Sequence, residues 1–381
     1  MAGREKGGAS STQLKQAPED DHPALTQRWG VMVAWASIAI LLCVVVYNAR
    51  TGAVSDRIRN PAIIGAPRPA HYPFGWTNWV TILQVGTLIA MILLVVGVAY
   101  AWHRQPRRPV LLMVASATGI VWWDPLVNWA PYAVYNPELW HWPEDWPLFS
   151  IAPVVEPFIV IGYAFFYVGP YFPAVWILRR IQERRPVDSF VWRHPLISMG
   201  ALIFLIGFVF DAWLEISCIR TGLYIYSQVI PFGSVFTGTV FQFPLLWEST
   251  LVTVVMIPAG VLLYRDDTGR TVAEKLAQRA RIFPSRPALG TFLLMFAILN
   301  VSYLGYFTAF GLIRDTRVAT SMACPWPYPE AKVYDPQGFY EKNGQPGPYS
   351  AGIWSTWMSA QPHGRPDVVR EEGGRCSPGR A

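Results

Sequence analysis

Residues 195–217 read PLISMGALIFLIGFVFDAWLEIS, and this stretch indicates the environment in which the chain folds. It contains no charged residue before Asp211, so an exposed helix of this composition could not be solvated. About 20 apolar residues in a helix cross roughly 30 Å of hydrocarbon. Because lipid offers no partner to free backbone N–H and C=O groups, such a run must be helical. Residues 195–217 are therefore predicted to form a transmembrane helix.

The same character recurs along the chain, in which 52% of residues are hydrophobic and only 15% are charged. A typical soluble protein is about 25% charged. We predict an all-α, polytopic transmembrane helical bundle of about seven spans within residues 29–312. A polar leader (1–28) precedes it, and an irregular, Pro- and Gly-rich tail (313–381) follows. The predicted spans are 29–48, 78–102, 110–130, 151–178, 195–217, 235–263 and 288–312.

The distribution of basic residues predicts the orientation in the cell membrane. With the leader in the cytoplasm, 18 Lys and Arg residues fall in the leader and cytoplasmic loops, and 5 in the outer loops. This bias follows the positive-inside rule and places the tail outside. Cys324 and Cys376 would then meet an oxidising compartment and could form a disulfide. The stretch 271–283 is amphipathic and predicts a short helix on the cytoplasmic membrane surface.

Several cofactor-dependent membrane chemistries lack the residues that they need. The last predicted span has no Lys, which a retinal protein requires. All six His residues lie outside the predicted spans, which argues against haem and di-iron sites. Phosphate-binding and dinucleotide motifs are also missing. We therefore predict no cofactor and no metal site, with a carboxylate-bound divalent cation as a lesser alternative.

Carboxylic acids inside or at the mouth of the predicted bundle carry the main functional signal. No Lys, Arg or His lies within a predicted span, so these acids have no cationic partner at their own depth. Burial and neighbouring acids favour the neutral form of a carboxyl group. A cluster would thus hold both protonated and ionised carboxyls, which suits general acid–base catalysis. The predicted catalytic residues are Glu248, Asp211, Glu215, Asp124 and Glu156.

Glu248 is the strongest candidate, because it is predicted near the middle of an otherwise uncharged span. The other acids also have structural explanations. Asp124 precedes a proline and could cap a helix. Glu156 also precedes a proline and could lie among lipid headgroups. Asp211 and Glu215 share a helix face, and Glu215 could pair with Arg220.

Aromatic residues gather in residues 122–146, which include six Trp and two Tyr. An interfacial aromatic belt is one explanation. The same stretch is acidic and has no Lys or Arg, so it could also cover a site for an apolar, oxygenated substrate or a cationic intermediate. For Asn300 and Tyr303, interhelical packing is an equal explanation. The predicted substrate-binding residues are Trp122, Trp123, Asn128, Trp129, Asn300 and Tyr303.

Three segments give the chain a family resemblance: WWDPLVNW (122–129), APVVEPF (152–158) and FDAWLEI (210–216). With the polytopic pattern, they resemble the avermectin spirocyclase (AveC-like) family over about residues 29–315. The resemblance implies a cofactor-independent membrane enzyme that closes a dihydroxy-ketone polyketide into a spiroketal, with dehydration as a linked activity. It leaves the substrate open among polyketides, isoprenoids and lipids. It supplies no catalytic residues, so the predicted sites depend on the acids alone.

Two hypotheses from other classes remain. A proton-coupled transporter or permease also places acids near mid-membrane, although no internal repeat is visible in this chain. A non-catalytic membrane partner of a lipid or sterol pathway would explain the apolar, aromatic interior. The predicted partners are an apolar small molecule drawn from the membrane and the lipid bilayer itself. No nucleic acid is expected, and the oligomeric state stays open.

Overall fold

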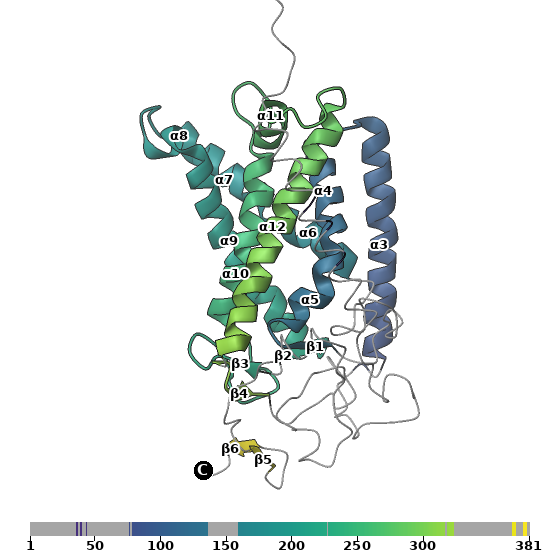
Figure 1. Ribbon diagram of the computed structural model, residues 1–381, viewed down its shortest axis with the longest axis vertical. Coiled ribbons are helices and arrows are strands. Elements are labelled where there is room, and N and C mark those ends of the chain that lie inside the picture. Colours follow the sequence, from purple (N-terminus) through teal and green to yellow (C-terminus); the bar gives the residue numbers. More distant parts are fainter. Residues whose placement is uncertain are drawn as a thin grey trace, which may run out of the picture.

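The computed structural model describes residues 78–135, 159–226, 228–316 and 318–323, the short segments 368–370 and 376–378, and positions 36, 39, 43 and 76. The leader, nearly all of the first predicted span and most of the tail lie outside the described residues, as does Cys324. The predictions made for these parts stay predictions. The long helices run along the long axis of a bundle (Figure 1).

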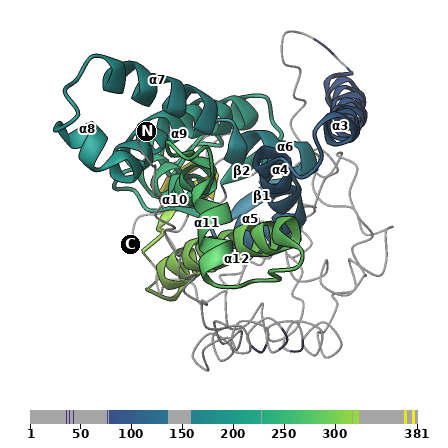
Figure 2. The ribbon, with the colours of Figure 1, turned by 90° about the horizontal axis from the view of Figure 1, so that it is seen from above.

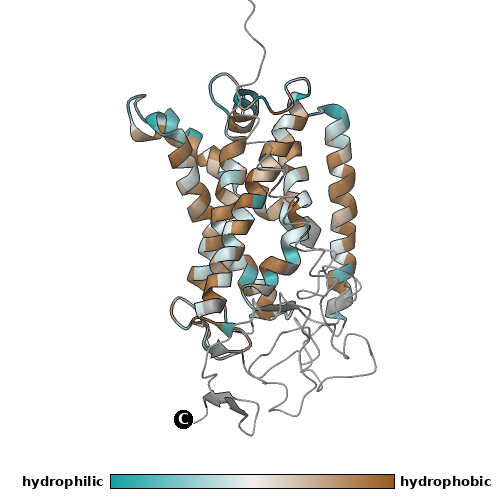
Figure 3. Ribbon diagram, viewed as in Figure 1, coloured by the Kyte–Doolittle hydropathy of each residue, from teal (hydrophilic) through white to brown (hydrophobic). Residues whose placement is uncertain are grey.

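Among the described residues, four helices are long and apolar enough to cross a membrane: α3 (Trp79–Arg104), α9 (Pro195–Arg220), α10 (Leu245–Leu263) and α12 (Pro287–Thr316). They correspond to predicted spans at 78–102, 195–217, 235–263 and 288–312. The chain is therefore a helical membrane protein, as its composition predicted. In Figure 3 hydrophobic residues cover these helices over most of their length, and polar residues gather at the bundle ends.

The predicted span 110–130 is a broken helix rather than a continuous one. It consists of α4 (Pro109–Gly119), the 3-10 turn η2 (Ile120–Trp123) and the short helix α5 (Asp124–Trp129). Pro125 has no N–H to donate to the preceding turn, so a regular helical ladder cannot continue through it. The break sets Asp124 at the start of a separate helix.

The predicted span 151–178 is interrupted as well. Its described part consists of α6 (Ile159–Val168) and α7 (Tyr171–Glu183), separated by Gly169 and Pro170. A Cβ on Gly169 would lie 2.5 Å from the carbonyl oxygen of Phe165, so no other residue fits this turn unchanged. The chain continues through the short helix α8 (Phe190–Arg193) into α9.

The sixth predicted span begins too early, which changes the position of Glu248. Residues 235–243 form a turn that is closed by an antiparallel bridge between Val235 and Phe243. The helix α10 begins only at Leu245, directly after Pro244. Glu248 therefore lies in the first turn of α10, and its predicted position near mid-span is wrong.

The helices α9 and α10 form the central pair of the bundle, and α10 also packs against α12. Their close approach depends on small residues, as is common between membrane helices. A Cβ added to Gly207 of α9 would lie 2.8 Å from Sδ of Met256 and 2.9 Å from Cγ2 of Thr253 on α10. By contrast, α3 lies at the edge of the bundle (Figure 2), with Leu93 and Val95 largely exposed.

In the part of the chain that the structure describes, three short two-stranded sheets accompany the helices, a feature that the all-α prediction missed. β1 (Ala133–Tyr135) pairs antiparallel with β2 (Tyr224–Tyr226), and β3 (Gln228–Val229) pairs with β4 (Ser321–Met322). β5 (Val368–Arg370) and β6 (Cys376–Pro378) form a hairpin in the tail. The first two pairings bring two connections and the start of the tail, all predicted on the outer side, to the same end of the bundle (Figure 1).

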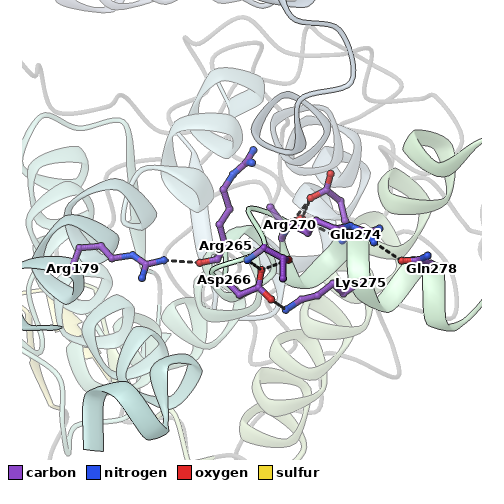
Figure 4. Close-up of polar contacts among 9 residues, drawn as sticks. Arg179, Arg265, Asp266, Arg270, Glu274, Lys275 and Gln278 are labelled. Carbon is purple, nitrogen blue, oxygen red and sulfur yellow. Dashed lines mark hydrogen bonds and ion pairs between the residues drawn. The ribbon is translucent and has the colours of Figure 1, made fainter. Parts of the chain in front are cut away.

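The predicted helix at 271–283 is present as α11 (Val272–Arg279), at the other end of the bundle. Its first turn carries a capping box, in which Thr271 and Glu274 satisfy each other's backbone N–H groups. The connection from α10 is fixed by polar contacts (Figure 4), including a hydrogen bond from Lys275 to Asp266. Hydrogen bonds from Lys275 and Thr268 lower the pKa of Asp266 to about 2.

The orientation gives a direct prediction. The connections that contain residues 187 and 275 are rich in Arg and Lys. A reporter fused after residue 187 or 275 is therefore expected to report the cytoplasm, and one after residue 140 or 360 the outside. Alkaline phosphatase and fluorescent-protein fusions would measure this. An outside signal at residue 187 would reverse the orientation.

Candidate functional site

Three of the predicted acids face one partly open cavity of about 120 Å³. Asp124 comes from α5, Glu215 from α9 and Glu248 from α10. Asp124 and Glu248 are buried, with 2% and 5% of their surfaces exposed. The described residues that line this acid cavity include no Lys, Arg or His. The structure thus brings together acids that are far apart in the sequence, and no cation neutralises them there.

Glu248 is held by a tyrosine of the neighbouring helix α12. The hydroxyl of Tyr306 lies 2.7 Å from Oε1 and 2.9 Å from Oε2 of Glu248, and it donates to this carboxyl. Because the helix begins at Leu245, the side chain of Glu248 projects into the bundle from its first turn. A carboxyl with one phenol as partner can either give or accept a proton without breaking a larger network.

Asp124 is held on one oxygen only. Its Oδ1 accepts hydrogen bonds from Nδ2 of Asn128 at 2.7 Å and from the hydroxyl of Tyr163 at 2.9 Å. Its buried Oδ2 has no hydrogen-bond partner in the described structure. The side chain makes no capping bond to α5, so the helix-cap explanation for Asp124 is wrong. A buried oxygen without a partner is costly, and it is free to accept a proton from a bound molecule.

Asp211 and Glu215 lie one turn apart on α9, on the side that faces α10. Asp211 is fully buried beside Ser249, and neither of its oxygens makes a regular hydrogen bond in the described structure. Glu248 lies close enough to interact electrostatically with both acids. The three carboxyls therefore form one electrostatic unit, although Asp211 lies behind the cavity wall.

Glu215 is bound by a tyrosine rather than by the cation that its sequence position suggested. The hydroxyl of Tyr226 on β2 donates to Oε2 of Glu215 at 2.7 Å. Arg220 instead lies over the rings of Phe236 and Phe241, at 4.6 and 4.3 Å from their centroids. The expected pairing of Glu215 with Arg220 does not occur. The strand β2 thus positions Tyr226 against Glu215.

Tyrosines form the part of the site that sequence reasoning missed. Tyr163 and Tyr167 of α6 line the cavity opposite Tyr303 and Tyr306 of α12. The hydroxyls of Tyr167 and Tyr303 are hydrogen-bonded, and the ring of Tyr163 stacks on that of Tyr303. Their spacings of four and three residues put each pair on one helix face. This periodicity is the signal that could have identified them, and only Tyr303 was predicted.

The comparisons with known proteins bear on the same part of the chain. A family model described as spirocyclase AveC-like matches residues 102–334, which is more than half of the sequence. The chain belongs to the AveC-like spirocyclase family. No curated protein and no solved structure matches it significantly. The family match begins later than the resemblance suggested, and it includes every residue of the acid cavity.

In this AveC-like protein the predicted substrate-binding residues divide into two groups. Asn128 and Tyr303 line the acid cavity. Trp122 and Trp123 do not line it, because both indole N–H groups donate to Oδ1 of Asn300, at 3.1 and 2.8 Å. Together with Asn300 they fasten the break after α4 to α12. The side chain of Trp129 lies outside the described structure.

Two further predictions concern residues that the structure does not describe. Glu156 and the aromatic stretch after residue 135 lie outside it. Within the described residues, no group of His, Cys, Asp and Glu has the arrangement of a metal site. The acid cavity of this family member is therefore described by carboxyls and phenols, and the role of each remains a prediction.

Proposed function

We propose that this protein is a membrane cyclase/dehydratase that works by carboxylate acid–base catalysis without a cofactor. The reaction would be spiroketal formation, or related chemistry on a polyketide, isoprenoid or lipid-like substrate. The observation that carries the proposal is the convergence of Asp124, Glu215 and Glu248 on one partly open cavity that phenol groups also line. Membership of the AveC-like family supports it.

The chemistry needs one proton donor, one proton acceptor and a polar surface for a cation. In its protonated form, Glu248 would give a proton to the ketone oxygen while a substrate hydroxyl attacks the carbonyl carbon. The free Oδ2 of Asp124 is suited to accept the proton that this hydroxyl loses. The proton now held by Asp124 would pass to the hemiketal hydroxyl, which leaves as water and gives an oxocarbenium ion. The ionised Glu248 would take the proton of the second hydroxyl, so both carboxyls return to their starting states. Attack by the second hydroxyl closes the second ring, so the net change is the loss of one water.

The oxocarbenium ion is the intermediate that the site must stabilise. Ionised carboxylates aimed at developing positive charge act strongly where water is excluded. The aromatic side chains of Tyr163 and Tyr303 line the same cavity and would add apolar, polarisable surface beside the cation. Asp211 and Glu215 would raise the negative potential beside Glu248. This arrangement explains why acids without a cationic partner are useful here.

The size of the cavity constrains how a substrate binds. About 120 Å³ is well below the roughly 300–1,000 Å³ of ligand sites, so only the reacting part of a large substrate fits. A separate apolar groove of about 710 Å³ is lined by residues of α3, α6, α7 and α9. The ring of Phe210 in this groove is 5.8 Å from that of Phe166, which lines the acid cavity. We infer that the groove holds the apolar remainder of the substrate.

An isotope experiment tests the reaction. Purified protein in lipid discs would be given a dihydroxy-ketone whose ketone oxygen is ¹⁸O, at neutral pH. The expected product has lost one water and its label, because the ketone oxygen leaves as water. Equal product formation without protein would contradict the proposal. Unchanged ketone that crosses a vesicle membrane would instead support the transporter hypothesis.

A tyrosine substitution probes the setting of Glu248. Tyr306→Phe removes a hydroxyl that donates to both oxygens of Glu248. A hydrogen bond to a charged group contributes about 1.5–3 kcal/mol, so turnover is expected to fall about 10–100-fold. Steady-state kcat and KM of the isotope reaction would show this, with the loss mainly in kcat.

The matched control is Tyr171→Phe. The hydroxyl of Tyr171 donates to the carbonyl of Leu263 near the far end of α10 and does not line the acid cavity. This variant is expected to keep its activity. Equal losses in both variants would show that Tyr306 acts through general packing.

A further inference from the structure

Two further cavities lie next to each other at the opposite end of the bundle from the acid cavity. They have volumes of about 540 and 520 Å³ and share Arg107, Leu112, Pro287 and Ala288 in their walls. Together they form one groove, here called the basic groove, between the α3–α4 connection, α11 and the start of α12. Figure 1 places these elements at the same end of the bundle.

The basic groove carries uncompensated positive charge. Arg107, Arg270 and Arg286 line it, and Glu274 is its only acidic lining residue in the described structure. Glu274 is already engaged, because it accepts hydrogen bonds from the backbone N–H and the hydroxyl of Thr271. Arg107 and Arg286 make no ion pair in the described part of the chain. An anion in this groove would therefore meet three arginines against a single carboxylate, which is already hydrogen-bonded to Thr271.

Arg270 is held in the groove wall by a hydrogen bond to a neighbouring side chain. Nη1 of Arg270 donates to Oε1 of Gln278 at 2.6 Å (Figure 4), so α11 holds this guanidinium. Its other N–H groups stay available for an anion, since guanidinium has five donors. The planar fork of arginine matches the oxygens of a phosphate.

The other wall of the basic groove is apolar. Leu112 and Ala115 of α4, Phe292 of α12 and Trp102 of α3 line it. Trp102 is 43% exposed and lies near the end of a spanning helix. Membrane proteins often have tryptophan at this depth, among the lipid headgroups. A small anion would leave this wall bare, whereas a ligand with a phosphate head and an acyl chain would cover both walls.

We propose that the basic groove binds an anionic phospholipid, with its phosphate at Arg107, Arg270 and Arg286 and its acyl chain along α4 and α12. Basic pockets between helix ends are suited to lipid headgroups because each Arg near the membrane surface attracts them. The site is distinct from the acid cavity, and the proposal does not depend on the proposed reaction.

Lipid titration followed by native mass spectrometry tests the proposal. The full-length protein, delipidated in neutral detergent, would be titrated with phosphatidylglycerol, with phosphatidylcholine of the same chains and with inorganic phosphate. Phosphatidylglycerol is expected to remain bound, and the Arg107→Gln/Arg286→Gln double variant to bind it about 10–30-fold more weakly. Phosphatidylcholine is expected to bind weakly to both proteins.

The matched control removes the same charge elsewhere. Arg184→Gln/Arg185→Gln changes two exposed arginines of the α7–α8 connection that do not line the groove. This control should bind phosphatidylglycerol within about threefold of the wild type. An equal loss in the control would mean diffuse attraction and overturn the site. Competition by millimolar inorganic phosphate would show a free-anion site and overturn the lipid assignment.

A second variant keeps the test valid if the double variant does not accumulate. Ala115 is exposed in the apolar wall, so Ala115→Trp fills the groove without changing its charge. This variant should weaken phosphatidylglycerol binding at least tenfold, although all three arginines of the groove are still present. Unchanged affinity in this variant would contradict the placement of the acyl chain.

Discussion

Replacing Glu248 with Gln is expected to lower turnover by about 10²–10⁴-fold, the usual contribution of general acid–base catalysis. The amide keeps the size of the side chain and an oxygen that can accept from the hydroxyl of Tyr306, which now bonds both carboxyl oxygens. It cannot exchange a proton. The protein should therefore insert and unfold as the wild type does, or be slightly more stable, because an ionisable group is gone from the bundle. The isotope reaction measures turnover, and thermal unfolding in detergent measures stability.

The control for Glu248→Gln is the same change at an exposed acid. Glu183 lies at the end of α7, where its side chain is 63% exposed beside Arg180. Glu183→Gln should leave both turnover and stability unchanged. A fully active Glu248→Gln protein would refute the assignment of Glu248. A variant that fails to accumulate would assign this residue to packing instead.

Asp124→Asn is expected to cost about 10²-fold in turnover, toward the lower end of acid–base contributions. The amide oxygen can replace Oδ1 and accept from Asn128 and Tyr163. The amide nitrogen then occupies the place of Oδ2, which has no partner in the described structure. The hydrogen-bond network survives, but the group that would take the proton of the attacking alcohol is lost. The effect should appear in kcat, with the melting temperature little changed.

Tyr163→Phe separates this role from a structural one. It removes one of the two donors to Asp124 and leaves the carboxyl itself unchanged. If Asp124 acts as a base, Tyr163→Phe should lose much less activity than Asp124→Asn. Equal losses, together with equal drops in melting temperature, would show that the hydrogen-bond network maintains the shape of the cavity and that Asp124 transfers no proton.

The acids could be identified from sequence because their signal is local. A carboxyl in a span without Lys, Arg or His stands out from its own neighbours, and Asp124, Glu215 and Glu248 do face one cavity. Their partners could not be identified in this way. The Tyr163–Asp124 bond joins residues 39 positions apart, and the Tyr306–Glu248 bond joins residues 58 apart. Neither pairing leaves a trace in the hydropathy of a single span.

Hydropathy also misjudged where helices begin and break. Residues 235–243 are apolar enough to extend a span, yet a bridge between Val235 and Phe243 folds them into a turn before α10. Glu248 is thus at the mouth of the bundle rather than at its middle. The same kind of error joined α4 with α5 and α6 with α7, because an apolar turn and an apolar helix have the same average hydropathy.

The sequence by itself determined that the chain is a helical membrane protein, the sign of charge at each connection, the family and the set of acids. These follow from composition and short-range pattern, since desolvation penalises any charged or unpaired group in lipid regardless of its partners. The tertiary structure decided which acids meet, which phenols hold them and where a basic groove forms beside α11. Those features depend on contacts between helices that are far apart in the sequence. An example is the close packing of Gly207 on α9 against α10.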